Sequence, residues 1–172
     1  AGSNTLSSPN CSSTASADSR TRNAVYDVTN FGANGSDSTD DTAGIQAAVD
    51  RANSEGGGTV WFPQGSYVVT SVTIYPGITY TGNNATLWRP ANQGKYMRTF
   101  TTGNWGVYAT DSAPLIVRCL IFDGNRANQG AYLGHELEQA HLLYAQAAPY
   151  SAGRITLIVE DAVFEEGVAD GI

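Results

Sequence analysis

The stretch PLIVRCLIFDGN, residues 114–125, decides the fold because it recurs along the chain at a fixed spacing. The segments VTIYPGITYTGN (residues 72–83) and TLIVEDAVFEEG (residues 156–167) lie 42 residues before and after it. A weaker echo at half that spacing repeats the letters TGN of residues 81–83 at residues 102–104. The alignment brings together two sets of apolar residues: Ile74, Ile116 and Ile158, and Tyr80, Phe122 and Phe164.

This repeat predicts a parallel β-solenoid. Self-similarity at about 20–50 residues is typical of repeat architectures, and each copy here consists of apolar and β-branched β segments rather than helix pairs. Stacked coils place like residues above one another, so we expect the isoleucine and aromatic columns to fill the interior. A β-propeller has a similar period, but its blades need four strands each, and it is the weaker alternative.

An amphipathic helix is expected at about residues 43–53, just before the β segment at residues 59–62. Its apolar stripe consists of Ile45, Ala48, Val49 and Ala52. Asp40, Asp41 and Thr42 precede the helix as candidate caps, and three glycines at residues 56–58 end it. A calcium site at Asp37, Asp40 and Asp41 is the alternative reading. Their spacing lacks the alternating ligands of a calcium loop, so no metal or other cofactor is predicted.

These patterns divide the chain into three parts. Residues 1–24 form a Ser/Thr-rich tail with little to bury, and residues 25–58 form an N-terminal cap that contains the helix. Residues 59–172 form the coils, which are expected either to continue beyond this chain or to pair with a partner. A cap is needed because the first coil of a solenoid exposes an apolar end and open strand edges.

Cysteines and sequons give weak evidence for export. Cys11 and Cys119 permit one disulfide, which would tie the tail to the body; two separate thiols are the alternative. Asn10, Asn34 and Asn84 each begin a sequon for N-glycosylation. The small residues at the start resemble a mature end after signal cleavage, so we expect a secreted, extracellular protein.

The charge balance limits the classes of molecule that the protein is expected to bind. Nine basic residues against 16 acidic ones leave a net charge of −7, which argues against nucleic acid and against an anionic membrane surface. No apolar run approaches the ~20 residues that a membrane span requires. A neutral polymer fits this charge, as does an acidic polymer held by a local basic patch, and polysaccharide is the expected partner.

Three segments together resemble a known family. They are YDVTNFGANG (residues 26–35), DDTAGIQAAV (residues 40–49) and GGGTVWFPQGSY (residues 56–67). In this order they resemble the opening of pectate-lyase-like right-handed parallel β-helix proteins, over residues 26 to about 90. LIFDGNRAN, residues 120–128, is similar to a coil of mannuronan C5-epimerases and related domains. The resemblance implies an all-β, right-handed parallel β-helix with an N-terminal capping helix. It does not fix the reaction, because lyases, hydrolases and epimerases share this opening.

The resemblance also implies that the catalytic coils lie at and beyond the end of this chain. Epimerase-like members carry a cluster of tyrosine, acid and histidine in this region, and Asp170 is the one weak catalytic candidate here. Other late acids, Glu160, Asp161, Glu165 and Glu166, are interpreted as solvated turn and face residues. His135 begins a pattern like a zinc-protease helix, but residue 139 is Gln, so both His135 and His141 are interpreted as surface or turn residues.

A sugar-binding face is predicted in the middle of the chain. Aromatic rings stack on sugars and arginine forks suit carboxylates, and this region concentrates both kinds of residue. The candidates are Trp88, Arg89, Lys95, Tyr96, Arg98, Trp105, Tyr108 and Arg126. Two alternatives stay open: the tryptophans fill core columns or plug loops, and Arg126 bridges coils structurally.

Three functions remain on the sequence alone. The first is an N-terminal fragment of a polysaccharide epimerase, lyase or glycoside hydrolase whose active site is incomplete in this chain. The second is a non-catalytic glycan-binding module. The third is a structural solenoid that self-associates through its last coil, since open β edges pair readily.

Overall fold

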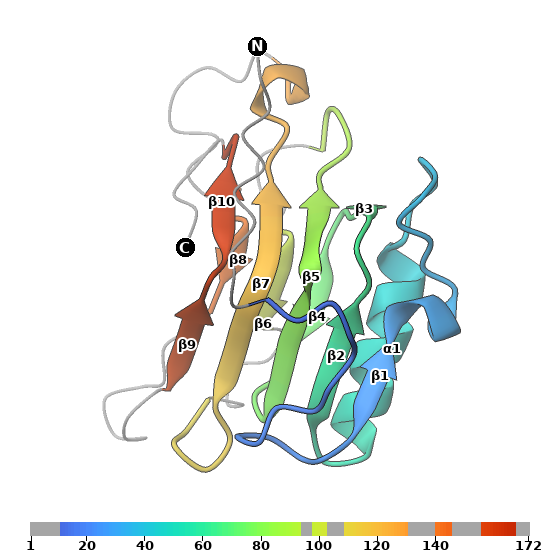
Figure 1. Ribbon diagram of the computed structural model, residues 1–172. Coiled ribbons are helices and arrows are strands. Elements are labelled where there is room, and N and C mark those ends of the chain that lie inside the picture. The colour runs from blue at the N-terminus through green and yellow to red at the C-terminus, as the bar shows by residue number, and fades with distance from the viewer. Residues whose placement is uncertain (1–10, 94–97, 103–108, 131–139, 146–155, 168–172) are drawn as a thin grey trace.

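The computed structural model describes residues 11–93, 98–102, 109–130, 140–145 and 156–167 (Figure 1). Within these ranges the chain is mostly β, with one α-helix, and every pairing between its strands is parallel. The helices are η1 (Val28–Phe31), α1 (Thr42–Ser54) and η2 (Arg126–Asn128). The strands are β1 (Val25–Asp27), β2 (Gly58–Phe62), β3 (Ser66–Val68), β4 (Val72–Ile74), β5 (Ile78–Trp88), β6 (Phe100–Thr102), β7 (Leu115–Asp123), β8 (Leu143–Tyr144), β9 (Leu157–Glu160) and β10 (Val163–Glu165).

The described strands form two sheets. The larger has seven strands in the order β1-β2-β5-β7-β10, with β3 also paired to β5 and β9 also paired to β7. The smaller sheet has the order β4-β6-β8. The predicted parallel β architecture with one helix is therefore confirmed for the described residues.

Strands β5 and β7 are long because each continues through an irregularity. Between them the register shifts from Thr81↔Arg118 to Ala85↔Leu120, and Asn84 and Cys119 take left-handed φ angles of 51° and 57°. The shift in register shows that one strand carries extra residues, as in a β-bulge, and such residues bend the strand. As a result β2 pairs with the first part of β5 and β3 with its end, while β9 and β10 divide β7 in the same way.

The last two copies of the repeat pair as predicted. Ile116 lies beside Ile158, and Phe122 lies beside Phe164 with the two rings stacked nearly parallel and their centroids 4.9 Å apart. The spacing of 42 residues holds for both halves of β7. Strand β9 therefore places an isoleucine beside an isoleucine, and β10 places a phenylalanine beside a phenylalanine.

For the first copy of the repeat, residues 72–83, the predicted alignment is wrong. Ile74 lies in β4 of the smaller sheet, Ile116 pairs with Thr79, and Tyr80 pairs with Val117. Leu87, not Tyr80, is the partner of Phe122 in β5. The interval from Thr79 to Ile116 is shorter than the interval from β7 to β9, so a constant offset could not follow both.

The helix packs against the larger sheet as its apolar stripe predicted. Ile45, Ala48, Val49 and Ala52 are all fully buried in the core. Asp40 accepts a hydrogen bond from the Thr42 N–H at 2.9 Å, which confirms it as a cap.

Asp41 does not cap the helix with its side chain. Its carboxylate instead accepts the backbone N–H groups of Asn34 at 2.6 Å and Val68 at 2.9 Å. Burial raises the pKa of Asp41 above its ordinary value. This carboxylate therefore joins the loop before α1 to β3.

Residues 11–24, which we call the strap, lie across the outer face of the larger sheet. In Figure 1 this dark blue segment passes over β7, β5 and β2 before it reaches β1. The Cys11–Cys119 disulfide fixes one end to β7, and the Thr59 N–H donates to the Ala24 carbonyl at 2.8 Å at the other. The predicted disulfide is confirmed, and the described part of the tail is held along its length.

The strap explains a second correction to the predicted core. Ile116 is fully buried, yet it does not belong to the core that contains its neighbours Leu115 and Val117. Alternate residues of a strand point to opposite faces, so Ile116 points outward with Thr79. Thr21 of the strap approaches Thr79 on this face, with their hydroxyl oxygens 3.3 Å apart. Ile116 thus lies on the face that the strap crosses and does not fill the interior, whereas Ile74 is part of the core.

No helix in the described part of the chain is long and apolar enough to cross a membrane.

We expect removal of the disulfide to lower the free energy of unfolding. The bridge joins residues 108 positions apart, and closing a loop of that length stabilises by up to about 4.7 kcal/mol in the chain-entropy model. The variant Cys11→Ala/Cys119→Ala should unfold at a lower denaturant concentration than the oxidised protein and should match the reduced protein. Identical transitions for the oxidised protein and the variant would contradict the bridge.

The stacked pair gives a second stability prediction. Phe122→Ala removes a fully buried ring that contacts both Phe100 and Phe164, and should cost about 3–5 kcal/mol in urea unfolding. Phe31→Ala, at a partly buried position on the edge of the core, is the control and should cost clearly less. Equal losses would show that the column through Phe122 is not the centre of the core.

Candidate functional site

The smaller sheet presents one polar column to the side away from the core. Val72, Phe100 and Leu143 are paired in register and fully buried in the core. Their successors Thr73, Thr101 and Tyr144 are also in register. Because side chains alternate along a strand, these three lie on the opposite face, where an extended ligand could cross the strands.

An arginine and two rings gather at Tyr144. The Arg98 guanidinium stacks over the Tyr144 ring at 3.6 Å from its centroid, and the His141 ring lies 5.7 Å from the same ring. A guanidinium that stacks by its face directs its N–H groups sideways, in the plane of the group. This is the geometry in which arginine binds carboxylates. We call Arg98, His141 and Tyr144 the arginine–tyrosine cluster.

The structure describes only part of the face predicted from sequence. Arg98 belongs to the cluster, whereas Tyr144 and His141 were not included in the predicted face. Lys95, Tyr96, Trp105, Tyr108 and the catalytic candidate Asp170 lie outside the described residues. The sequence contains one signal for Tyr144: it directly follows two leucines, Leu142 and Leu143, and is itself an amphipathic residue.

Arg89 is a correction to the predicted face. Its side chain is fully buried and donates to the carbonyls of Ala140 at 3.3 Å and His141 at 3.0 Å. Burial lowers the pKa of Arg89 to about 10. This arginine therefore holds the segment before β8 in place and does not present its charge to a ligand.

Trp88 and Arg126 lie near the turn after β7. Trp88 is half-buried at the end of β5, beside Asp123. Arg126 is exposed in η2, after the left-handed Asn125, whose amide donates to the Arg89 carbonyl at 3.0 Å. The turn after β7 is thus joined to the end of β5 through Asn125, whereas the sequence suggests Arg126 as the bridging residue.

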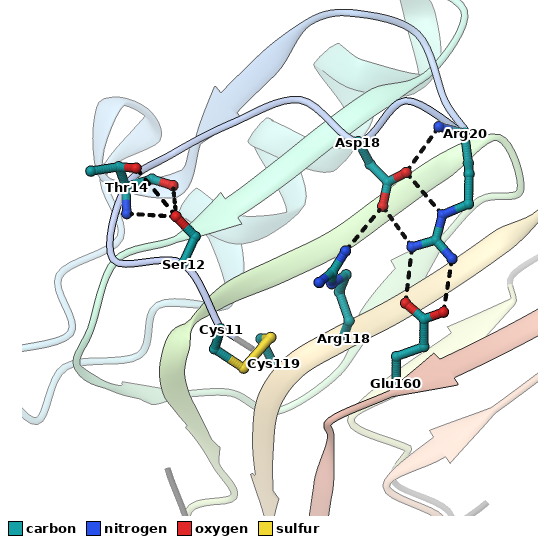
Figure 2. The surroundings of a disulfide bond; sticks show 8 residues. All are labelled: Cys11, Ser12, Thr14, Asp18, Arg20, Arg118, Cys119 and Glu160. Atoms are coloured by element: carbon teal, nitrogen blue, oxygen red, sulfur yellow. Dashed lines mark hydrogen bonds and ion pairs between the residues drawn. A yellow bond between two sulfur atoms is a disulfide. The ribbon is translucent and has the colours of Figure 1, made fainter. Parts of the chain in front are cut away.

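A second polar site lies beneath the strap. Trp61, Thr81, Arg118 and Glu160 form a column in register across β2, β5, β7 and β9. The strap closes over this column and leaves a cavity of about 460 Å³. Figure 2 shows the cavity's surroundings from the disulfide to Glu160.

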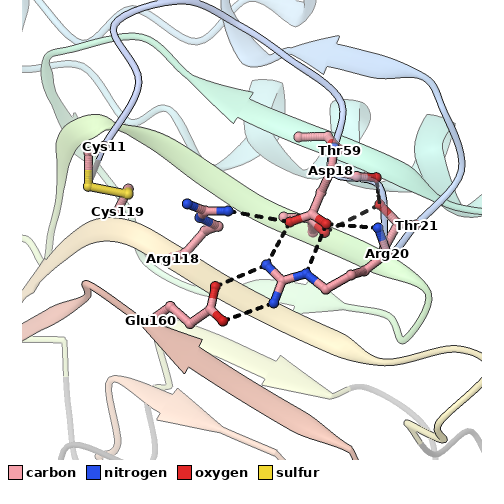
Figure 3. Close-up of polar contacts among 9 residues, drawn as sticks. Cys11, Asp18, Arg20, Thr21, Thr59, Arg118, Cys119 and Glu160 are labelled. Atoms are coloured by element: carbon pink, nitrogen blue, oxygen red, sulfur yellow. Dashed lines mark hydrogen bonds and ion pairs between the residues drawn. A yellow bond between two sulfur atoms is a disulfide. The ribbon is translucent and has the colours of Figure 1, made fainter.

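Four charged groups are linked in this cavity. Arg20 of the strap contacts both oxygens of Glu160 at 2.9 Å and also contacts Asp18 at 2.8–3.0 Å. Arg118 approaches Asp18 less closely, at 3.6 Å. As Figure 3 shows, Asp18 is further positioned because its backbone N–H donates to the Thr59 hydroxyl at 2.9 Å. Glu160 had been interpreted as a solvated face residue, and although partly exposed it is paired.

The paired carboxylates are suited to holding the strap and not to donating protons. Hydrogen bonds from Arg20 lower the pKa values of both Asp18 and Glu160 below their ordinary values. A general acid working near neutral pH needs a raised pKa instead. We therefore assign the network of Asp18, Arg20 and Glu160 to fixing the strap on the sheet.

Comparisons with known proteins agree with the fold. The family model described as rhamnogalacturonase A/epimerase, pectate lyase-like, matches residues 25–128. Two solved structures from Azotobacter vinelandii are similar: the A-module of mannuronan C-5 epimerase AlgE4, with a TM-score of 0.61 and 23% identity, and that of AlgE6, with 0.58 and 24%. They cover 84% and 81% of this chain, and 39% and 37% of their own.

Two sequence relatives come from the same organism. Alginate lyase 7 is 56% identical over 45 residues, which are 26% of this chain and 5% of that protein. Mannuronan C5-epimerase AlgE6 is 32% identical over 111 residues, which are 60% of this chain and 13% of that protein. The chain therefore spans a small fraction of the curated relatives it matches.

The paired charges predict an acid-sensitive strap. The pKa values of Asp18 and Glu160 are lower in the folded chain than their ordinary values of 3.8 and 4.5, so the unfolded chain takes up protons first as the pH falls. Their stabilisation is complete above those values and is lost as the pH falls through the lower folded pKa values. Arg20→Gln should therefore flatten the dependence of the unfolding free energy on pH between about pH 5 and 2.

The exposed Arg126→Gln is the matched control and should keep the dependence of the unaltered protein. A dependence in Arg20→Gln as steep as that of the unaltered protein would contradict the assigned role of Arg20.

Proposed function

The chain belongs to the rhamnogalacturonase A/epimerase, pectate lyase-like family, and from this membership we propose that it is a secreted, polysaccharide-acting protein of the epimerase and lyase type. The observation that carries the proposal is its 32% identity to mannuronan C5-epimerase AlgE6 over 60% of its length. The disulfide supports an oxidising, extracellular location.

We propose that the strands wind as a right-handed solenoid and that α1 caps its first coil. Parallel partners far apart in sequence, such as β2 with β5 and β5 with β7, support winding because each return to the sheet needs a crossover. The fully buried stripe of α1 supports the cap. We propose that the protein acts without a cofactor. Its catalytic coils would lie beyond the residues described.

The arginine–tyrosine cluster is the proposed contact for the polymer. An enzyme that removes the proton beside a uronate carboxylate must neutralise that carboxylate, and Arg98 supplies a positive charge on an extended strand face. The Tyr144 ring adds an apolar surface of the kind that packs on sugars. We also keep the other sugar-binding candidates from the sequence, Trp88, Lys95, Tyr96, Trp105 and Arg126, as proposed contacts for the polymer.

A uronate polymer therefore fits this cluster better than a neutral one. The relatives named as mannuronan epimerases make polymannuronate the appropriate probe. If the protein bound polymannuronate but neither epimerised nor cleaved it, that result would favour the non-catalytic glycan-binding module over the enzyme.

Polymannuronate binding tests the cluster. Arg98→Gln and Tyr144→Ala should each weaken the affinity measured by calorimetry by about tenfold, because each removes one side of the charged contact. Arg51→Gln, an exposed arginine on α1, is the control and should leave the affinity unchanged. The proposed face would be wrong if both cluster variants bound the polymer as tightly as the unaltered protein.

A further inference from the structure

The strap is held at several points along its length, but its two parts are held in different ways. Its second part, residues 18–24, has polar contacts of its own with the larger sheet. The Asp18 backbone N–H donates to the Thr59 hydroxyl at 2.9 Å, and the Arg20 guanidinium donates to both oxygens of Glu160 at 2.9 Å. These contacts do not depend on the disulfide.

The first part of the strap, residues 11–17, is held by the disulfide. Apart from its half-buried ends, this part is exposed. Among the described residues, its hydrogen bonds join only Ser12 and Thr14, which both belong to the strap itself. Within the described part of the chain, the Cys11–Cys119 bridge is therefore its one bond to the sheet.

The first part of the strap has little else to keep it in place. Ordering the backbone costs conformational entropy at every residue, and an exposed segment without bonds to the sheet gains little that offsets this cost. Local opening occurs in segments with few buried contacts. We therefore expect cleavage of the bridge to free the first part while Asp18 and Arg20 stay bound.

The first part of the strap also covers one end of the cavity. Ser12 and Ser16 line the cavity from the strap, and Trp61 and Cys119 line it from the sheet. Trp61 is only 4% exposed and Cys119 only 1%. Cys11 is bonded directly to the Cys119 sulfur, as Figure 2 shows, so departure of Cys11 would uncover that atom.

We propose that the disulfide makes the first part of the strap a redox-controlled lid over the cavity. The lid is closed while Cys11 and Cys119 are bonded and opens when a thiol reductant cleaves the bridge. The larger sheet and the second part of the strap stay folded in both states. This lid is independent of the polymer contact at Arg98, which lies beside the other sheet.

The opening reaction is thiol–disulfide exchange. A thiolate of the reductant attacks one of the two sulfurs, which breaks the S–S bond and forms a mixed disulfide. A second thiolate of the reductant then displaces that cysteine, and the reductant leaves as its own disulfide. Cys11 and Cys119 together take up two electrons and two protons. Exchange with a small-molecule disulfide reverses these steps and closes the lid.

Alkylation of Cys119 tests the lid. In the oxidised protein neither cysteine has a thiol, so iodoacetamide should leave both unmodified. After reduction with dithiothreitol under native conditions, Cys119 should react within about tenfold of its rate in the urea-unfolded chain, because an uncovered thiol is accessible to the reagent. Mass spectrometry of the tryptic peptides measures both rates.

Hydrogen exchange at two amides separates local opening from wider changes. The Asp18 N–H, which donates to Thr59, reports on the second part of the strap. The Phe100 N–H, which donates to the Leu142 carbonyl at 2.9 Å, reports on the core. Both amides should keep their protection after reduction.

Two variants test the bridge without a reductant. Cys11→Ser removes the bridge and should give the Cys119 alkylation rate of the reduced protein. Ser13→Ala changes an exposed residue in the same part of the strap and is the matched control. Its bridge stays intact, so its oxidised form should not react with iodoacetamide.

The lid would be excluded by any of three outcomes. The first is that Cys119 of the reduced protein and of Cys11→Ser reacts a hundredfold or more slowly than in the unfolded chain, which would show that the strap stays closed without the bridge. The second is loss of protection at Asp18 on reduction, which would mean that the whole strap leaves. The third is loss of protection at Phe100, which would mean that the core unfolds.

Discussion

Parallel register across β2, β5, β7 and β9 is the constraint on which both the cavity and the strap depend. Backbone hydrogen bonds hold neighbouring strands about 4.8 Å apart, so residues in register form continuous columns. One such column brings Arg118 beside Glu160, although they belong to segments 42 residues apart. A slip of one residue in either strand would turn its charged side chain into the core and separate it from its partner.

The outer face of this sheet carries residues that are not suited to water. Thr59, Thr79 and Ile116 are fully buried there, although none of them points into the core. The strap covers them, and its polar groups are satisfied by Thr59, Thr79 and the charged network. Its composition, poor in apolar residues, is therefore consistent with an ordered segment, because its contacts are hydrogen bonds and ion pairs.

Sequence reasoning predicted the elements whose signals are local or regular. The stripe of Ile45 and Val49 predicted α1, and the spacing of 42 residues predicted the Phe122–Phe164 pair. It failed where the interval between coils changed, as at Ile74. It also failed where a distant partner decided the outcome. Arg89 looks like a surface charge until the carbonyls of residues 140 and 141 are brought to it. Likewise, nothing near Asp18 or Arg20 in sequence indicates Glu160.

Arg98 and Arg118 show how surroundings give one side chain two uses. Arg98 stacks on the face of the Tyr144 ring, so its contact there is a cation–π interaction. Arg118 lies beside Asp18, so its charge acts within the network that holds the strap. One type of residue therefore takes part in a cation–π contact beside the smaller sheet and in a charged network on the larger one.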